Sequence, residues 1–295
     1  MLASTHPEKK HPGRTAPLAD TEFVAVDTET TGLWWGDRVV EVGAVRFRGS
    51  TVIDRFRSLV NPRQAIPPEV TRIHRITDAM AARAPVAREV LPALLRFCEG
   101  APCLAHFAEF DRGILATEFV RAGLQPPATR VYCTVALARK AWPELPRHGL
   151  HALVQHLGIP SGAPHRALAD ADAARQVFLA ALPWLGERPT REDLDRAVGP
   201  GGRLTFRETT RALTALPHRL RALRTAIRHR RTVTVLVRLE HPAEGCEVVV
   251  ARERVPEAVY THGGEAWVDL RDPTAEADRV TSVPLHQIVA VRGRL

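Results

Sequence analysis

Lysine is almost absent from this chain, since only three of its 41 basic residues are lysines and the rest are arginines. Cysteine is also sparse, and the absence of any Cys-x-x-Cys pair argues against a disulfide framework and against a zinc ribbon. No apolar run approaches the roughly 20 residues that span a bilayer, and the first twenty residues lack the apolar stretch of a signal peptide. These absences predict a cytoplasmic protein with no membrane partner. Reduced thiols are expected at Cys98, Cys103, Cys133 and Cys246.

The length of 295 residues fits two domains at the usual ~100–200 residues per domain. A hydrophobic content of 45% and a charged content of 25% are typical of a globular protein. The formal net charge of +8 favours a polyanionic partner, nucleic acid above all, without establishing one. The predicted segments are a disordered tail over 1–20, a first domain over 21–184, a linker with a short helix over 185–204, and a C-terminal domain over 205–295.

Three strand patterns open the first domain. FVAVD at 23–27, VVEVGAVRF at 39–47 and TVIDRFRSLV at 51–60 predict an antiparallel meander. Helical and strand patterns then alternate as far as an alanine-rich helix over 168–181. This order predicts an α/β fold with a mixed sheet flanked by helices.

Four carboxylates and one histidine stand at the ends of these predicted elements. Asp27 and Glu29 end the first strand, where side chains two residues apart point to the same face. Asp111 stands at the start of a helix, and His165 and Asp170 at the start of the last helix of the domain. Converging carboxylates need a cation, and oxygen ligands select Mg²⁺ or Mn²⁺. The set is therefore suited to two divalent ions that lie close together.

The motifs TEFVAVDTETTGL, LAHFAEFD and HRALADADAA resemble the three motifs of the DEDDh 3′–5′ exonucleases, over about residues 20–182. The resemblance implies a ribonuclease H-like fold, two divalent cations (Mg²⁺ or Mn²⁺), and His165 as the general base. Arg166 stands where the tyrosine branch of this superfamily carries its tyrosine, which favours the histidine branch. The implied metal ligands are Asp27, Glu29, Asp111 and Asp170.

The function that this resemblance implies is hydrolysis of the terminal phosphodiester of single-stranded DNA, with release of 5′-mononucleotides, in DNA repair or proofreading. It further implies a polymerase or a repair complex as a partner, in the bacterial cytoplasm or nucleoid. Two alternatives stay open. One is a 3′–5′ exoribonuclease, because the same chemistry serves both sugars. The other is a regulatory protein that senses nucleic acid or nucleotides with a weakly active nuclease scaffold.

Substrate contacts also follow from the resemblance. The backbone after the first motif would meet the 3′-terminal nucleotide, with Leu33 wedged against its base; the residues concerned are Thr30, Thr31, Gly32 and Leu33. Trp34 and Trp35 extend this loop, where base stacking and packing are equally open. Phe107 is expected beside the substrate and stands where the family usually has Asn, which leaves the substrate preference open.

Several polar residues near the motifs are expected to have no catalytic role. Asp172 lies about 200° around the helix from Asp170 and is expected to be a solvated charge. The predicted helix HGLHALVQHLG carries three histidines for which solvent or packing roles are favoured over catalysis: His148, His151 and His156.

The C-terminal domain begins with a strongly basic segment. Residues 203–231 hold nine arginines against one acid, so their net charge of +8 equals that of the whole chain. Within HRLRALRTAIRHRR the apolar residues share one stripe, which predicts an amphipathic helix with a basic outer face. We expect this face to bind nucleic acid through Arg219, Arg221, Arg224, Arg228 and Arg231.

The remaining segments TAIRHRRTVTVLVRL, ERVPEAVYTHGGEAWVDL and RVTSVPLHQIVAVR resemble the WYL domain of bacterial regulators. That family has a small SH3-like β barrel preceded by a helix and is thought to bind nucleic acid or nucleotides. Trp267 keeps the tryptophan of the family's Trp-Tyr-Leu triplet and is a candidate nucleic-acid contact, although a tryptophan in a strand is more often a core residue. Arg254 and Arg279 are candidate anion contacts.

Overall fold

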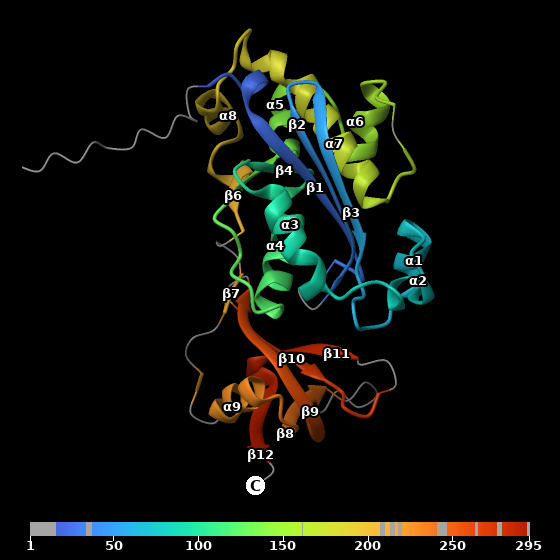
Figure 1. Ribbon diagram of the computed structural model, residues 1–295, viewed down its shortest axis with the longest axis vertical. Coiled ribbons are helices and arrows are strands. Elements are labelled where there is room, and N and C mark those ends of the chain that lie inside the picture. The colour runs from blue at the N-terminus through green and yellow to red at the C-terminus, as the bar shows by residue number, and fades with distance from the viewer. Residues whose placement is uncertain are drawn as a thin grey trace, which may run out of the picture.

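A mixed sheet of six strands forms the centre of the first domain (Figure 1). The computed structural model describes residues 16–33, 37–160, 162–206, 210–212, 216–217, 220–240, 247–262, 265–275 and 279–293. The strands are β1 (Glu22–Thr30), β2 (Val39–Arg48), β3 (Thr51–Leu59), β4 (Cys103–Ala105), β5 (Arg130–Cys133) and β6 (Arg203–Thr205). In the order β3-β2-β1-β4-β5-β6, the first three are antiparallel, β4 and β5 continue parallel to β1, and β6 is antiparallel to β5. The predicted meander and mixed sheet are confirmed.

Helices cover both faces of this sheet. The helices of the first domain are α1 (Pro68–His74), α2 (Asp78–Ala82), α3 (Ala87–Cys98), α4 (Ala108–Arg121), α5 (Thr134–Ala141), α6 (Leu150–His156), α7 (Ala167–Ala181) and α8 (Arg191–Val198). Of these, α6 packs on α5 and α7, and α2 packs near the start of β2. Because side chains alternate along a strand, Val24 and Val26 of β1 pack with α3 and α4, whereas Phe23 and Ala25 pack with α5, α7 and α8. No helix in the described part of the chain is both long and apolar enough to cross a membrane.

The segment predicted as a linker, 185–204, is instead part of the first domain. Helix α8 begins with a capping box at Thr190, and Leu194 and Val198, one helical turn apart, are buried against α5 and α7. Strand β6 then pairs with β5, and Phe206 after it is buried in the core on the α4 face. The apolar spacing within a charged helix was therefore a packing signal, and the first domain extends to about residue 206.

The C-terminal domain is built on a curled antiparallel sheet. Its elements are β7 (Thr210–Ala212), α9 (Arg221–His229), β8 (Val233–Glu240), β9 (Glu247–His262), β10 (Glu265–Arg271), β11 (Val280–Pro284) and β12 (Ile288–Gly293). Strand β9 pairs with β8 through its first half and with β10 through its second half, which bends the sheet around one core. Leu223 and Ala226 of α9 enter that core. The predicted amphipathic helix exists, but it covers only 221–229 of the basic segment.

The two domains meet where the C-terminal end of α4 lies against β9 and β10 (Figure 1). Arg121 donates to the carboxylate of Asp269 at 2.7 Å and to the Tyr260 hydroxyl at 2.8 Å. Arg121 also pairs with Glu118, whose carboxylate in turn accepts from Arg38 at 2.6 Å. We call these four charged residues, Arg38, Glu118, Arg121 and Asp269, the interdomain network.

Candidate active site

The C-terminal half of β1 places two carboxylates on one face of the sheet. Asp27 and Glu29 continue the alternation of Phe23 and Ala25, so they face α7, whose first turn carries Asp170. Oxygen atoms of Asp27, Glu29 and Asp170 lie within 4.8 Å of one another. The sequence prediction that these three acids converge is therefore met by the geometry.

Asp111 reaches the same place from the other face. Thr28 points toward α4, and its backbone N–H and its hydroxyl both donate to the Asp111 carboxylate, at 2.9 and 2.8 Å. Asp111 itself is buried in the first turn of α4. The two hydrogen bonds tie this carboxylate to the residue between Asp27 and Glu29. We call the four acids Asp27, Glu29, Asp111 and Asp170 the carboxylate cluster.

The carboxylate cluster holds its protons more tightly than isolated acids do. Burial and the neighbouring carboxylates raise the pKa of Asp27 well above its ordinary value. Burial, with Asp170 and Glu41 nearby, raises the pKa of Glu29 to about 8. Burial raises the pKa of Asp111 to about 7 despite the hydrogen bonds from Thr28. Like charges in so small a space need a cation, and an all-oxygen donor set fits hard divalent ions such as Mg²⁺ and Mn²⁺.

The close approach of α7 to the sheet depends on Gly43. Gly43 lies opposite Asp27 in the β1–β2 ladder and faces α7. A Cβ atom at this position would lie 2.1 Å from the amide nitrogen of Leu168 and 2.2 Å from the carbonyl carbon of Ala167. The absence of a side chain therefore lets the first turn of α7, and with it Asp170, reach the strand that carries Asp27.

An ion pair fixes the start of α7, and sequence analysis missed it. Glu41 of β2 is fully buried opposite Glu29 and accepts two hydrogen bonds from the Arg166 guanidinium, at 2.7 and 3.0 Å. Its carboxylate also accepts from the backbone N–H of Ala167 at 3.1 Å. Arg166, where the tyrosine branch would have its tyrosine, is thus a structural anchor. The sequence did contain a sign of this contact. Glu41 and Gly43 alternate on β2 as Asp27 and Glu29 do on β1, so all four lie on the face that meets α7.

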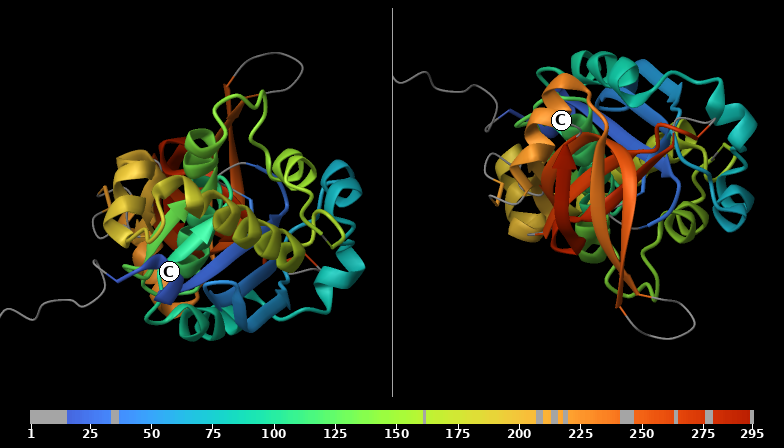
Figure 2. Two further views of the ribbon diagram at one scale, coloured as in Figure 1. Left: turned by 90° about the horizontal axis from the view of Figure 1, so that it is seen from above. Right: turned by 90° about the horizontal axis from the view of Figure 1, so that it is seen from below.

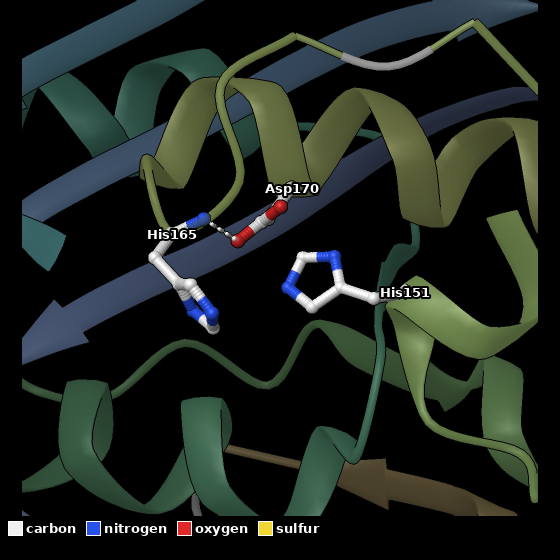
Figure 3. Close-up of side chains that lie close together, drawn as sticks. All are labelled: His151, His165 and Asp170. Carbon is white, nitrogen blue, oxygen red and sulfur yellow. Dashed lines mark hydrogen bonds between the residues drawn. The ribbon is translucent and has the colours of Figure 1, made fainter. Parts of the chain in front are cut away.

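His165 stands directly before this anchor, at the entrance to α7. Its backbone is left-handed, with φ of 57°, and its N–H donates to Asp170 at 3.0 Å. Few side chains adopt such a backbone, and at a functional position it marks a residue held in place by its surroundings. Figure 3 shows the imidazole of His151 from α6 beside it, with ring centroids 4.7 Å apart. Burial raises the pKa of Asp170, while His151 and His165 act in the opposite direction.

The predicted substrate loop after β1 lies next to the carboxylate cluster. The Thr30 hydroxyl donates a hydrogen bond to the Gly32 carbonyl, and the Thr31 hydroxyl donates one to the Asp37 carboxylate. Leu33 is 76% exposed and is free to meet a ligand. Trp34 and Trp35 lie outside the described residues.

Phe107 caps the N-terminal end of α4 and is half exposed. Its φ of 55° and ψ of 49° are left-handed, a conformation that Asn tolerates better than Phe. Its ring contacts His106 edge to face, with centroids 5.3 Å apart. The backbone would therefore suit an Asn at this position, and Phe107 adds an exposed aromatic surface there.

The arginines predicted to bind nucleic acid are not brought to the carboxylate cluster. Those described on or after α9, namely Arg221, Arg224, Arg228 and Arg231, are exposed, and Arg219 lies outside the described residues. In the right view of Figure 2, α9 lies on the opposite side of the molecule from α1 and α6. Trp267 packs beside Tyr260 and Val120 at the domain contact. Asp172 pairs with Arg175 at 2.7 Å, away from the cluster.

Sequence comparisons agree with this geometry. Residues 24–178 match the model of a family described as Exonuclease, RNase_T. The chain is 40% identical over 159 residues to the DNA polymerase III subunit epsilon of Treponema pallidum, a match that covers 53% of this chain and 74% of that protein. It is 37% identical over 186 residues to a bifunctional exonuclease/endonuclease protein of Mycobacterium tuberculosis, covering 60% of this chain. The match spans only 29% of that mycobacterial protein.

Solved structures share the fold. The nuclease domain of 3′hExo, a DEDDh family member bound to rAMP, matches with a TM-score of 0.51 at 17% identity, covering 59% of this chain and 98% of that one. A structure of exonuclease I matches with a TM-score of 0.51 at 18% identity, covering 93% of this chain and 65% of that one. At these identities the likeness concerns the fold alone, and the second match includes the C-terminal domain.

Proposed function

The chain belongs to the RNase_T exonuclease family, and on this premise we propose that it is a divalent-metal-dependent 3′–5′ exonuclease that acts on single-stranded DNA. The observation that carries the proposal is the carboxylate cluster, in which three acids from β1 and α7 converge within 4.8 Å inside the family match. Asp111 is tied to the same strand, and His165 stands beside Asp170. The products would be 5′-mononucleotides.

Each catalytic group has a physical task in this proposal. Divalent cations held by the carboxylate cluster would supply Lewis-acid activation of water and charge stabilisation for the leaving 3′ oxygen. His165 accepts the proton of the attacking water, and its hydrogen bond to Asp170 fixes the backbone from which the imidazole projects. The Arg166–Glu41 pair holds that segment against β2.

The substrate assignment favours DNA over RNA. Support comes from the similar protein of Treponema pallidum, which is named as a subunit of DNA polymerase III. The corresponding partner of this chain would be a polymerase or a repair complex. Leu33 and Phe107, both exposed beside the cluster, are suited to contact the terminal base. The exposed arginines of α9 would hold the strand farther away, so their replacement by alanine should lower the salt dependence of binding.

The test uses a 5′-labelled single-stranded DNA and an RNA of the same sequence, each with Mn²⁺, Mg²⁺ or EDTA. We expect shortening from the 3′ end of DNA in Mn²⁺, no shortening in EDTA, and slower cleavage of RNA. His165→Ala should lose about 10²–10⁴-fold in rate, whereas His156→Ala, exposed on α6, should stay near wild type. Immediate release of the 5′ label, or activity that survives EDTA, would exclude the proposal. Faster cleavage of RNA would reassign the substrate.

A further inference from the structure

A second group of metal-binding side chains overlaps the carboxylate cluster. Among the described residues, two groups of three bring their ligand atoms within 4.8 Å: Asp27, Glu29 and Asp170, and His151, His165 and Asp170. Figure 3 shows the two imidazoles and the carboxylate gathered at the first turn of α7. Because three separate segments supply them, namely α6, the loop before α7 and α7 itself, their meeting is a product of the fold.

The two groups differ in the ions they suit. Three carboxylates offer only oxygen, which fits Mg²⁺ and Mn²⁺. Two imidazoles and one carboxylate are a donor set for borderline transition metals such as Zn²⁺, and His₂-carboxylate sites with an open fourth position are well known for zinc. Asp170 belongs to both groups, so an ion in one group changes the ligand available to the other.

We propose that His151, His165 and Asp170 form a site for a borderline transition metal, Zn²⁺ foremost, and that its occupation inhibits hydrolysis. Inhibition rests on the proposed function, whereas binding of the ion does not. An imidazole nitrogen that donates its lone pair to an ion cannot accept a proton from water, so a bound ion would remove His165 as a base. The ion would also coordinate Asp170, a carboxylate that Asp27 and Glu29 need as the third ligand for Mg²⁺ or Mn²⁺.

The side chains need only a small movement to close this site. Ligand atoms about 2.0–2.1 Å from a tetrahedral zinc ion lie about 3.4 Å from one another. The ligand atoms lie within 4.8 Å of one another, so rotation of the side chains has to close at most about 1.4 Å per pair. The rings already meet at 73° with centroids 4.7 Å apart. One Asp170 oxygen is held by the His165 N–H, which keeps this carboxylate in place during closure.

Direct binding is the first test. Titration of metal-free full-length protein with Zn²⁺ by calorimetry compares wild type, His151→Asn and the control His156→Asn, which changes an exposed histidine of the same helix. We expect one strong site in wild type and in His156→Asn, and affinity at least about 10-fold weaker in His151→Asn. Co²⁺ should give a visible absorption band of tetrahedral type that His151→Asn loses. Equal Zn²⁺ affinity in all three proteins would overturn the proposal.

Inhibition is the second test, with each rate normalised to the same protein without zinc. Zn²⁺ added to the Mn²⁺-supported reaction should inhibit wild type and His156→Asn at similar concentrations, and His151→Asn only at concentrations about 10-fold higher. If Asp27→Asn abolishes Zn²⁺ binding and His151→Asn does not, zinc occupies the carboxylate cluster and the proposal is wrong. If wild type binds Zn²⁺ through His151 yet cleaves no DNA in Mn²⁺, the metal site stands and the exonuclease function fails.

Discussion

The carboxylate cluster and the interdomain network are both groups of four charged residues, but only the network contains both signs of charge. In the cluster Asp111 and Asp170 are buried, and Asp27 and Glu29 are half-buried. Two glutamates show the contrast. Burial and nearby carboxylates raise the pKa of Glu29 in the cluster to about 8. Glu118 in the network is buried, yet Arg38 and Arg121 lower its pKa below the ordinary value. The pKa of a glutamate is therefore raised where its neighbours are carboxylates and lowered where they are guanidinium groups.

This difference in charge distinguishes a candidate metal site from a structural ion-pair network. The network is complete within the chain, because Arg121 and Arg38 neutralise Asp269 and Glu118. All four members of the cluster are acids, and Arg166, which is paired with Glu41, offsets only part of the raised pKa of Glu29. A buried group with uncompensated charge of one sign is completed by a ligand of opposite sign, here a divalent cation.

Among changes outside the catalytic residues, the largest effect is expected from Gly43→Ala. The new Cβ would lie 2.1 Å from the α7 backbone, so α7 must move and carry His165 and Asp170 with it. A displacement near 1 Å at a catalytic site can cost about 10²-fold in rate, and we expect at least that loss of Mn²⁺-supported hydrolysis. Gly201→Ala is the control, because nothing lies within 4 Å of its added Cβ. A Gly43→Ala protein as fast as wild type would contradict the role of this close approach.

Arg121→Met should give the next largest effect, on stability. Removing the guanidinium leaves Asp269 and Glu118 buried with less compensation, which costs about 3–5 kcal/mol in the free energy of unfolding. Arg196→Met, which removes the exposed partner of Asp193, should leave the urea midpoint close to that of wild type, because solvent screens exposed ion pairs. Urea denaturation of both variants measures the difference. Equal midpoints would mean that the network does not join the domains.

The carboxylate cluster should make the stability of the metal-free protein depend on pH. Glu29 has a folded pKa of about 8, above its unfolded value of roughly 4.3, so the metal-free folded protein keeps a proton that the unfolded chain releases. The contribution of Glu29 to stability therefore falls as pH rises between those two values. Because a divalent ion replaces the retained protons, the rise in melting temperature caused by Mn²⁺ should grow from about pH 5 to about pH 8.

Thermal unfolding with Mn²⁺ and with EDTA measures this increment at each pH. Glu29→Gln removes one titrating group of the cluster and should flatten the dependence. An increment that is the same at every pH in wild type would show that the cluster does not exchange protons for the ion.

Phe107→Asn should give the smallest effect. Asn tolerates the left-handed backbone of this position, so the free energy of unfolding should rise by about 0.5–1 kcal/mol. Loss of the exposed ring should raise the KM for single-stranded DNA if it contacts a base. Phe107→Ala separates the two effects, because it removes the ring without relieving the backbone. No gain in stability for Phe107→Asn relative to Phe107→Ala would refute the backbone explanation.

Local patterns predicted much of the first domain. Alternation along β1 and the order of the acid motifs predicted a mixed sheet and the convergence of Asp27, Glu29 and Asp170, whereas strand β6 fell in the predicted linker. Two features were beyond local patterns. Arg121 and Asp269 are 148 residues apart, and Glu41 and Arg166 are 125 apart. Pairs so distant in sequence become visible only when the sheet and its helices are in place.

His151 and the segment over 185–204 show a different limit. Histidine on a short helix is usually a packing or surface residue, and only the approach of α6 to the start of α7 brings His151 beside His165. Charge and glycine content favoured a linker over 185–204, but Leu194 and Val198 decided its packing. In both cases the contacts made in the folded protein, rather than the local amino-acid composition, determined what the residues do.

The most direct test of the central claim is a calorimetric titration of the metal-free protein with Mn²⁺ near pH 7.5, in wild type, Asp27→Asn and Arg196→Met. Two ions should bind to wild type and to Arg196→Met, and Asp27→Asn should weaken or abolish binding, because the Asp27 carboxylate interacts with those of Glu29, Asp111 and Asp170. Unchanged Mn²⁺ binding in Asp27→Asn would contradict the assignment of the carboxylate cluster as the metal site.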